Sequence, residues 1–352
     1  MRKSAKKNII YSILLLLVVF MVYLYRQSKD SPEQPKQDDP KMVVSGPTMG
    51  TTYRIVYLDE GRRDFKEEID ALLGEINQAL STYIPESEIS RFNRMDSLVF
   101  DSPHFYPVLE KSKAIYDATN GAFDPTVGPL VNAWGFGPEG ATLKDSAEVQ
   151  QILDQVGFDQ LVFDQKGIRK ANTDVYLDLS AIAKGYGVDK LAEYLNEKGV
   201  QNYLVEVGGE LVSKGVNDKG ELWKVGISRP DEEGLANELF SILALDNKGM
   251  ATSGNYRNFY IKDSVKYSHT ISPYTGYPVE HSLLSATVVA EDCMTADAFA
   301  TAFMVLGIEK AKEIYESTDG LEVFLIYNDD RGQMQSFVSE GLIPYITAVD
   351  KE

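Results

Sequence analysis

The sequence predicts an α+β domain in which a mainly antiparallel sheet packs against helices. Its short β-rich runs and its amphipathic helical runs come in groups rather than in strict alternation, which favours this class over a parallel α/β fold. We find no internal repeat and no second linker, so residues 42–352 are expected to form one large domain. A chain of ~300 residues buries ~75% of its unfolded surface, which is enough for stability without disulfides.

The first half of this domain is expected to contain a strand and two helices. Residues 49–57 alternate in polarity and are β-rich, and residues 65–80 carry apolar side chains at the helical period. After an expected loop at 81–93, residues 105–119 form a second helical pattern that ends at Asn120-Gly121, a common helix stop. The segment that follows, up to residue 137, has too much glycine and proline for a regular element.

The second half is expected to be richer in strands. Helices are predicted at 146–156, 182–198, 294–306 and 308–317, and strands near 160–163, 175–179, 202–207, 223–228, 239–245, 257–261, 266–271, 284–290 and 322–327. The only cysteine, Cys293, excludes a disulfide within one molecule and is expected to be a small buried residue.

The N-terminal segment has the pattern of a membrane anchor. Residues 9–25 are almost wholly apolar and uncharged, just long enough against the ~17 residues that a spanning helix needs. Basic residues precede this run, and no small-residue cleavage site follows it. We therefore expect residues 1–8 in the cytoplasm, an uncleaved single-pass anchor at 9–25 in the inner (cytoplasmic) membrane and a flexible linker at 26–41. The folded domain is then expected on the extracytoplasmic, periplasmic side.

The charge of the domain limits what it can bind. The chain has 35 basic and 53 acidic side chains, and no acidic residue stands before Asp30, so the domain is more acidic than the whole chain. No cluster of Lys and Arg interrupts this acidity, which excludes nucleic acid as a partner. An anionic ligand is expected to bind through a metal ion, a lysine or backbone amides.

Asp297 and Thr301 are candidates for a metal site. They lie four residues apart in an Ala-rich helical run, so their oxygens project from one helix face. Mg²⁺ takes such oxygen ligands and completes its octahedron with water or phosphate. The alternative is a helix whose Asp faces solvent and whose Thr bonds to its own helix.

Asp178 and Lys184 are candidates for binding a phosphate. Asp178 follows apolar residues, and Lys184 is expected at the start of a helix beside Gly185. Free N–H groups at a helix start, together with an ammonium, can hold a phosphate. In the alternative interpretation, Asp178 caps this helix and Lys184 lies in an ordinary turn.

Four further residues fit flavin chemistry. His269 ends a β-run, and its pKa near neutrality would let it take a proton from a hydroxyl nucleophile. Phe123-Asp124 and Tyr83 offer aromatic faces near an acid, which suits an isoalloxazine or adenine ring. A structural histidine and aromatic core plugs are the alternatives.

In their order and spacing, these residues and their surroundings resemble the ApbE family, the flavin transferases that move FMN from FAD to proteins. The similarity covers residues 49–306 and is carried by Met49-Gly-Thr-Thr-Tyr, Leu80-Ser-Thr-Tyr, Ser87-Glu-Ile-Ser-Arg-Phe-Asn, Gly121-Ala-Phe-Asp-Pro-Thr-Val-Gly-Pro, Asp178-Leu-Ser-Ala-Ile-Ala-Lys-Gly-Tyr, Val207-Gly-Gly-Glu, Ala251-Thr-Ser-Gly-Asn-Tyr, Ser268-His-Thr-Ile-Ser-Pro-Tyr-Thr-Gly and Thr295-Ala-Asp-Ala-Phe-Ala-Thr-Ala. Ser272 and Asn255 stand where other members often have aspartate.

The resemblance implies a reaction and a set of site residues. FMN would pass from FAD to a Ser or Thr hydroxyl of a target protein, a subunit of a membrane redox complex, with release of AMP. His269 would be the catalytic base. Mg²⁺ would bind the Ala181 carbonyl and the side chains of Asp297 and Thr301. The FAD site would be lined by Met49, Tyr83, Ala122, Phe123, Asp124, Asp178, Lys184 and Ile271.

Two other functions remain open from the sequence. An FAD pyrophosphatase would use the same residues, with water in place of the hydroxyl, and would release free FMN and AMP. A non-enzymatic flavin-binding membrane protein would have no need of His269. The identity of the acceptor and the oligomeric state do not follow from the sequence.

Overall fold

The computed structural model describes Met21 and residues 40–136, 146–172, 174–230, 238–255, 259–262, 265–268 and 270–349. The chain divides into two units, Met1–Lys41 and Met42–Glu352. The predicted anchor at 9–25 lies outside the described residues except for Met21, and so does most of the predicted linker. Among the residues that are described, no helix combines the length and apolar character needed to cross a membrane.

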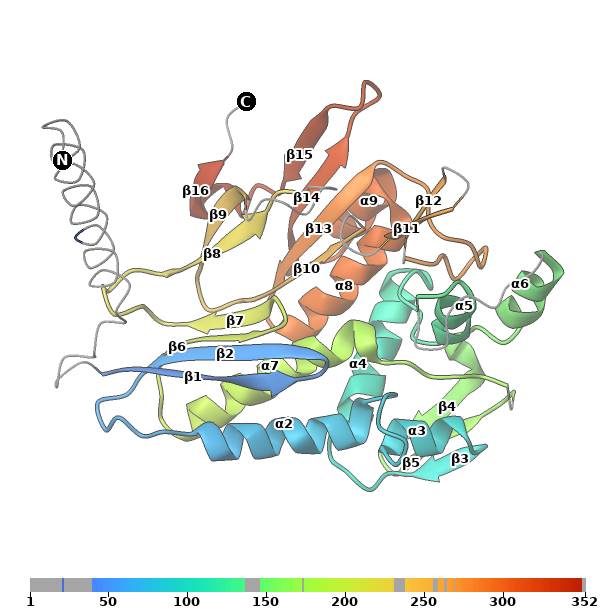
Figure 1. Cartoon of the computed structure of the whole chain (residues 1–352), viewed down its shortest axis with the longest axis horizontal. Coiled ribbons are helices and arrows are strands. Elements are labelled where there is room, and N and C mark those ends of the chain that lie inside the picture. The colour runs from blue at the N-terminus through green and yellow to red at the C-terminus, as the bar shows by residue number, and fades with distance from the viewer. Residues whose placement is uncertain are drawn as a thin grey trace, which may run out of the picture. The chain divides into compact units, whose positions relative to one another are not determined.

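An eight-stranded sheet forms the centre of the second unit (Figure 1). Every neighbouring pair from β2 to β15 is antiparallel, as predicted for the fold class. In spatial order the strands are β1 (Lys41–Thr48), β2 (Thr51–Leu58), β6 (Asn202–Val207), β7 (Glu210–Lys214), β10 (Gly249–Gly254), β13 (Leu283–Ala290), β14 (Glu322–Asn328) and β15 (Met334–Val338).

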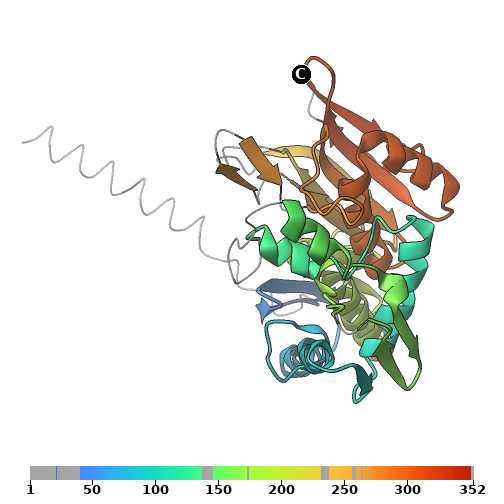
Figure 2. The ribbon, with the colours of Figure 1, turned by 90° about the vertical axis from the view of Figure 1, so that its right-hand side faces the viewer.

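Helices cover one face of this sheet, and a second sheet covers part of the other face (Figures 1 and 2). On the helical face, α2 (Lys66–Leu80), α7 (Ser180–Glu197) and α8 (Cys293–Leu306) bury apolar side chains in two clusters. On the other face, β8 (Trp223–Ser228) and β9 (Leu239–Leu245) pack Val225, Ile227 and Leu243 against Leu211 and Met250. With β16 (Ile346–Val349), they form a three-stranded sheet in the order β16-β9-β8.

The remaining elements surround this core. They are α3 (Glu88–Asn93), β3 (Ser97–Val99), α4 (Phe105–Ala118), α5 (Gly128–Ala133), α6 (Ser146–Leu153), β4 (Leu161–Asp164), β5 (Gly167–Lys170), β11 (Phe259–Lys262), β12 (Val265–Ser268) and α9 (Ile308–Ser317). Strands β3, β5 and β4 form a small antiparallel sheet, and β11 pairs with β12.

Helices α7 and α8 are joined at the point where α8 begins. The Asp189 carboxylate on α7 accepts hydrogen bonds from the backbone N–H groups of Cys293 and Met294, both at 2.8 Å. The side chain of Asp292 caps α8 by accepting from the N–H of Thr295 at 2.7 Å. These carboxylates satisfy N–H groups that a helix start leaves free. Cys293 is buried, as predicted.

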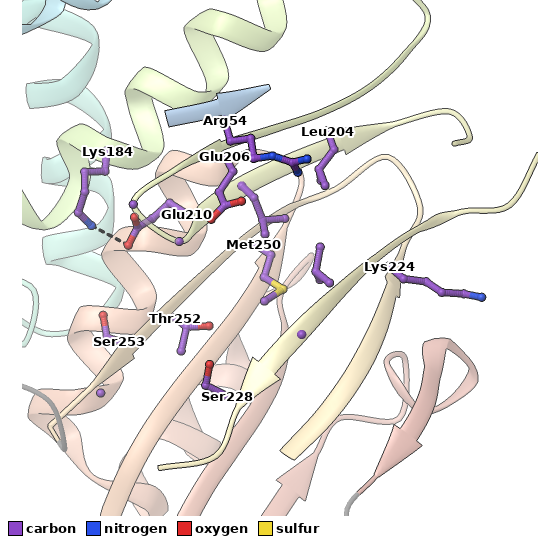
Figure 3. Close-up of a pocket in the computed structure, with 16 residues that line it drawn as sticks. Arg54, Lys184, Leu204, Glu206, Glu210, Lys224, Ser228, Met250, Thr252 and Ser253 are labelled. Carbon is purple, nitrogen blue, oxygen red and sulfur yellow. Dashed lines mark ion pairs between the residues drawn. The ribbon is translucent and has the colours of Figure 1, made fainter. Parts of the chain in front are cut away.

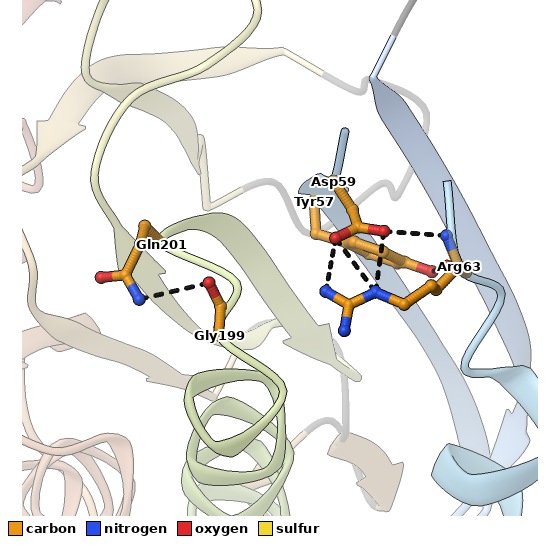
Figure 4. A network of polar contacts seen from close by, with 5 residues as sticks. All are labelled: Tyr57, Asp59, Arg63, Gly199 and Gln201. Atoms are coloured by element: carbon orange, nitrogen blue, oxygen red, sulfur yellow. Dashed lines mark hydrogen bonds and ion pairs between the residues drawn. The ribbon is translucent and has the colours of Figure 1, made fainter. Parts of the chain in front are cut away.

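The connection from β2 to α2 is held by a small polar network (Figure 4). The carboxylate of Asp59 is 7% exposed and accepts from the guanidinium and the backbone N–H of Arg63. The Tyr57 hydroxyl donates to the Arg63 carbonyl at 2.5 Å. The guanidinium of Arg63 holds the pKa of Asp59 below its usual value. The carboxylate that follows β2 is therefore ionised and paired with Arg63.

Several sequence predictions for the first half were wrong. The segment 81–93 is not a loop throughout: α3 begins after Ser87, whose hydroxyl accepts from the N–H of Ser90. The Gly- and Pro-rich segment contains α5, which has a proline in its first turn, where the missing N–H costs no hydrogen bond.

Val175, Leu177 and Leu179 are buried, but residues 175–179 do not form the predicted strand. Their backbone pairs with a side chain, because Asn93 donates to the Leu177 carbonyl and accepts from its N–H, both at 2.8 Å. The N–H of Asp178 donates to Pro125. The apolar pattern of residues 175–179 therefore predicted the burial of their apolar side chains correctly, but it wrongly predicted that their backbone pairs with another strand.

Strands β1, β3, β5, β7, β10, β15 and β16 were not predicted, and the strand at 322–327 does not close the chain. The helices at 65–80, 105–119, 146–156, 182–198, 294–306 and 308–317 are confirmed to within three residues at either end.

Candidate active site

One cavity of about 470 Å³ lies where the starts of α7 and α5 meet the middle of α8. Apart from Met49 and His269, every residue that the sequence assigned to the site lines it: Tyr83, Ala122, Phe123, Asp124, Asp178, Ala181, Lys184, Ile271, Asp297 and Thr301. These residues come from segments far apart in the chain, and the fold brings them to one place. Because the resemblance predicts that these residues bind FAD, we refer to this cavity as the flavin cleft.

Met49 and His269 are the exceptions. Met49 lies in the β1–β2 turn with a positive φ of 47°, and its side chain packs near Gly187 of α7 rather than lining the cleft. His269 lies outside the described residues, but Thr270 and Ile271, which follow it directly, line the cleft.

Lys184 lies between two buried carboxylates. Its Nζ is 2.6 Å from Glu210 Oε1 (Figure 3) and 3.9 Å from Asp297 Oδ1. Glu210 is 5% exposed and Asp297 is 3% exposed. Burial alone would lower the pKa of Lys184, but Asp297 and Glu210 outweigh it and raise the pKa, so the lysine is an ammonium.

The two carboxylates share this one ammonium. Burial, followed by the charge of Asp297, raises the pKa of Glu210 to about 7, although Lys184 opposes the shift. Burial also raises the pKa of Asp297, against the effects of Lys184 and of a hydrogen bond from Gly185. The cluster therefore holds more negative than positive charge when both acids are ionised, and a bound cation would relieve that excess.

The oxygen atoms around Asp297 suit a hard cation. Its Oδ2 accepts from the N–H of Gly185 at 3.0 Å, an N–H that in a regular helix serves the carbonyl of Ala181. The hydroxyl of Thr301, one helical turn from Asp297, lies 3.4 Å from Ser253 Oγ. A carboxylate, a carbonyl and a hydroxyl are ligands that Mg²⁺ accepts, with water or phosphate at its other positions.

In the described part of the chain, no three His, Cys, Asp or Glu side chains gather into a metal-binding group. The predicted metal set has a single carboxylate, so it would need oxygens from a bound ligand. This fits Mg²⁺, which keeps several positions for substrate phosphates.

The start of α7 is arranged around Asp178. Its Oδ1 accepts from the N–H of Ser180 at 2.9 Å and from the Ser180 hydroxyl at 2.6 Å. Asp178 is not the N-cap of this helix: Leu179 is, and its side chain makes no cap hydrogen bond. Asp178 also lines the cleft, so its bonds with Ser180 fix its position there.

Asp124, which also lines the cleft, is fixed in a similar way. Its Oδ1 accepts from the N–H of Thr126 at 2.8 Å and from the Thr126 hydroxyl at 2.6 Å. Burial raises the pKa of Asp124, although the bonds from Thr126 oppose the shift.

The two aromatic candidates differ in exposure. Tyr83 is 73% exposed and lies at the edge of the cleft, where its ring is free to cover a flat ligand. Phe123 is 1% exposed and belongs to the main core, so its ring is a core plug. Phe123 also lines the cleft, and its contact with a flavin or adenine ring stays a prediction.

Glu210 is the acid that sequence reasoning missed. The motif Val-Gly-Gly-Glu was noted, but no role was given to its acid. A signal was present, since an acid directly after a Gly-Gly turn and before an apolar strand is an unusual position for a solvated charge.

The fold is that of flavin transferases with solved structures. The structure "Flavin Transferase ApbE from Vibrio cholerae" matches with a TM-score of 0.79 and 38% identity, covering 87% of this chain and 99% of that one. The apo form of a Pseudomonas stutzeri flavinyl transferase ApbE matches with a TM-score of 0.78 and 33% identity, over 88% and 98% of the two chains. An FAD:protein FMN transferase of Haemophilus influenzae is 42% identical over 311 residues, which are 84% of this chain and 89% of the relative.

The chain belongs to the ApbE family, whose model matches residues 49–325. The resemblance seen in the sequence is thereby confirmed. The matched region contains the whole flavin cleft.

Proposed function

We propose that this protein transfers the FMN half of FAD to a Ser or Thr hydroxyl of an acceptor protein and releases AMP. One observation carries the proposal: residues assigned to FAD and Mg²⁺ from the sequence, scattered between Tyr83 and Thr301, line a single cleft. The names of its relatives, FAD:protein FMN transferases, support the same reaction class.

The reaction needs a base and a leaving group. In the proposed step, His269 takes the proton of the acceptor hydroxyl, and the oxygen attacks the phosphorus on the FMN side of the pyrophosphate. The bond from that phosphorus to the bridging oxygen breaks, and AMP leaves with that oxygen. The products are a phosphoester-linked FMN-protein, AMP and a proton that passes from His269 to solvent.

Lys184 and the start of α7 are suited to the pyrophosphate. The ammonium lies at the cleft wall, and Ser180 and Ala181 at the start of the helix line the same cavity. When bound, Mg²⁺ supplies positive charge that offsets the charge of the phosphates. We assign it to Asp297, Thr301 and the Ala181 carbonyl.

The role proposed for His269 draws on the residues that follow it in the chain. Thr270 and Ile271, which come directly after it, line the cleft. Trp134 holds this segment from the other end, because its indole N–H donates to the Gly276 carbonyl at 2.7 Å. A base on a fixed turn is what proton transfer at a positioned hydroxyl requires.

We also propose that residues 9–25 anchor the protein in the inner membrane with the domain on the periplasmic side, and that the acceptor is a subunit of a membrane redox complex. Tethering both partners to one membrane raises their effective concentration. Protease added to intact spheroplasts should then digest the domain. A domain that is protected until the cells are lysed would contradict this orientation.

The transfer itself is tested with the full chain in detergent, FAD, Mg²⁺ and a redox-complex subunit from the same genome. Mass spectrometry should show the acceptor gaining the mass of an FMN phosphoester. The gain should disappear with His269→Ala, a loss of about 10²–10⁴-fold for a missing base.

His281→Ala is the matched control. His281 itself does not line the cleft, although its Nε2 bonds the carbonyl of Met304, which does, and the variant should transfer at nearly the wild-type rate. Free FMN and AMP with an unmodified acceptor would indicate the pyrophosphatase instead. Full transfer by His269→Ala would remove the histidine from the mechanism.

A further inference from the structure

A second cavity of about 650 Å³ meets the flavin cleft at Lys184 and Ser253, which line both (Figure 3). It lies on the side of the large sheet that faces β8. Its walls include the β6–β7 turn at Gly208 and Gly209, the second half of β10 and the strand β8. We call this cavity the strand groove.

The groove exists because β7 is shorter than its neighbour. The pairing of β10 with β7 covers only Gly249↔Val212 and Met250↔Leu211. On its other side, β10 stays paired with β13 as far as Gly254↔Ser285. The second half of β10 therefore has a strand on one side only, among the described residues.

The backbone groups that face the groove follow from the pairing. The backbone N–H of Asn255 donates to the Leu284 carbonyl. In an antiparallel pair every second residue bonds the neighbouring strand, so the backbone groups of Ser253 and Ala251 also face β13. Consistently, the N–H of Ser213 on β7 donates to Lys248. The N–H and C=O groups of Thr252 and Gly254 therefore point away from β13, into the groove.

The opposite wall of the groove is also a strand edge. Strand β8 is the outer strand of its sheet, and its pairing with β9 leaves its other edge without a strand in the described part of the chain. Val225, Gly226 and Ser228 of this strand line the groove. Gly209 adds width, because a Cβ there would meet no atom within 4 Å.

We propose that the strand groove binds the acceptor protein as an extended segment, which adds to the free edge of β10 at Thr252 and Gly254. The proposal rests on the transfer reaction proposed above. An unpaired strand edge offers a row of hydrogen bonds to any extended chain, independent of its side chains. An acceptor needs such binding, because its reactive hydroxyl must be held beside the phosphorus.

The two faces of β10 explain how such a segment reaches the flavin. Met250 packs in the core beneath β8 and β9, whereas Ser253 lies against Thr301 of α8. Side chains alternate along a strand, so a segment beside β10 would point every second side chain toward α8. A Ser or Thr at such a position enters the flavin cleft past Ser253 and Lys184.

The proposal is tested by removing one N–H from the edge. Thr252→Pro deletes the N–H that faces the groove and leaves the bonds to β13 in place. It also deletes the hydroxyl, which lies 2.9 Å from Thr287 Oγ1, so Thr252→Val measures that loss separately. We expect KM for the acceptor to rise about tenfold more in Thr252→Pro than in Thr252→Val, as the loss of ~1.4 kcal/mol gives, with an unchanged Kd for FAD.

Ser336→Pro is the matched control. Ser336 lies on the outer strand β15. The N–H of Ser339 donates to the Val323 carbonyl of β14, and the direction of the N–H groups alternates along a strand. The N–H of Ser336, three residues earlier, therefore points away from β14. The control should leave KM for the acceptor unchanged. Equal KM values in Thr252→Pro and Thr252→Val, or a change in the Kd for FAD alone, would overturn the proposal.

Hydrogen exchange supplies a second measurement that depends neither on turnover nor on the fold of a variant. The full-length wild-type protein is mixed with the redox-complex subunit whose acceptor residue is changed to Val. Peptides that cover 250–254 and 223–228 should exchange more slowly in the complex. Protection confined to other peptides would overturn the proposal. If the wild-type protein transfers no FMN, the proposed function fails, while the exchange experiment still reports where the subunit binds.

Discussion

The N–H of Gly185 on α7 donates to the carboxylate of Asp297 on α8 at 3.0 Å, across 112 residues of sequence. The contact is close enough that a Cβ on Gly185 would lie 2.5 Å from the Cys293 carbonyl oxygen and 2.7 Å from Met294 Cα. Glycine is therefore required here for the approach of two backbones. The same approach positions the predicted metal ligand.

Gly185→Ala should destabilise the protein by about 1–3 kcal/mol or more, because rigid backbone must move to admit the methyl group. Thermal unfolding of the two proteins measures the difference. Gly74→Ala is the control: Gly74 lies on the exposed face of α2 with no atom near its Cβ position, so this variant should gain about 0.5–1 kcal/mol. A Gly185→Ala protein as stable as the wild type would refute the close packing.

Asp297→Asn should abolish the Mg²⁺ dependence of FAD binding. The substitution keeps the size of the side chain and removes its charge, which a hard cation needs. Titrations of FAD should give a Kd about tenfold higher or more in the variant, equivalent to ~1.4 kcal/mol or more. Wild-type protein in EDTA should behave like the variant in Mg²⁺. Wild-type FAD affinity that is equal in EDTA and in Mg²⁺ would exclude the metal.

Glu210→Gln should change how stability depends on pH. The pKa of Glu210 is raised from 4.5 to about 7 by burial and by Asp297, so the folded protein prefers the protonated acid. The stability that this acid contributes is full below pH ~4.5 and is lost as the pH rises through about 7. In the variant, Lys184 keeps Asp297 as its partner.

Urea unfolding at several pH values without Mg²⁺ measures this effect. The two proteins should be similar near pH 5, and the variant should become the more stable one by pH 8. A difference that stays constant over this range would mean that Glu210 does not titrate there.

Tyr83→Ala should weaken FAD binding, whereas Tyr83→Phe should not. The ring is exposed at the edge of the cleft, and an aromatic contact contributes ~0.5–1.5 kcal/mol beyond its buried area. Fluorescence titration should show a Kd up to about tenfold higher for the alanine variant alone. Equal weakening by both substitutions would assign the effect to the hydroxyl.

Much of the cleft could be predicted from the sequence because its residues stand in short motifs with distinctive neighbours. Asp297 and Thr301 required only the helical period, and the structure has both on α8. Glu210 could not be assigned, because its partner Lys184 comes from another element and only the fold brings them to 2.6 Å.

The strands that escaped prediction have a common cause. Strand β10 contains glycine at both ends, and β7 has an acid and a lysine at its ends, so neither shows a strong apolar alternation. Their pairing comes from neighbours in the sheet, which a local pattern does not report. Residues 175–179 show the reverse case. Their apolar alternation is strong, but their backbone bonds the side chain of Asn93 instead of a neighbouring strand.

The order of the strands has a consequence for how the protein folds. Strands β2 and β6 are adjacent in the sheet, yet the chain between them contains Tyr83, Asp124 and Asp178. Closing so long a loop is slow, because its entropy is lost before the pairing compensates. Asp297 lies on α8, which follows β10 and β13 in the chain. The cleft is thus assembled from early, middle and late parts of the polypeptide, and a nascent or partly unfolded chain has no site in which to consume FAD.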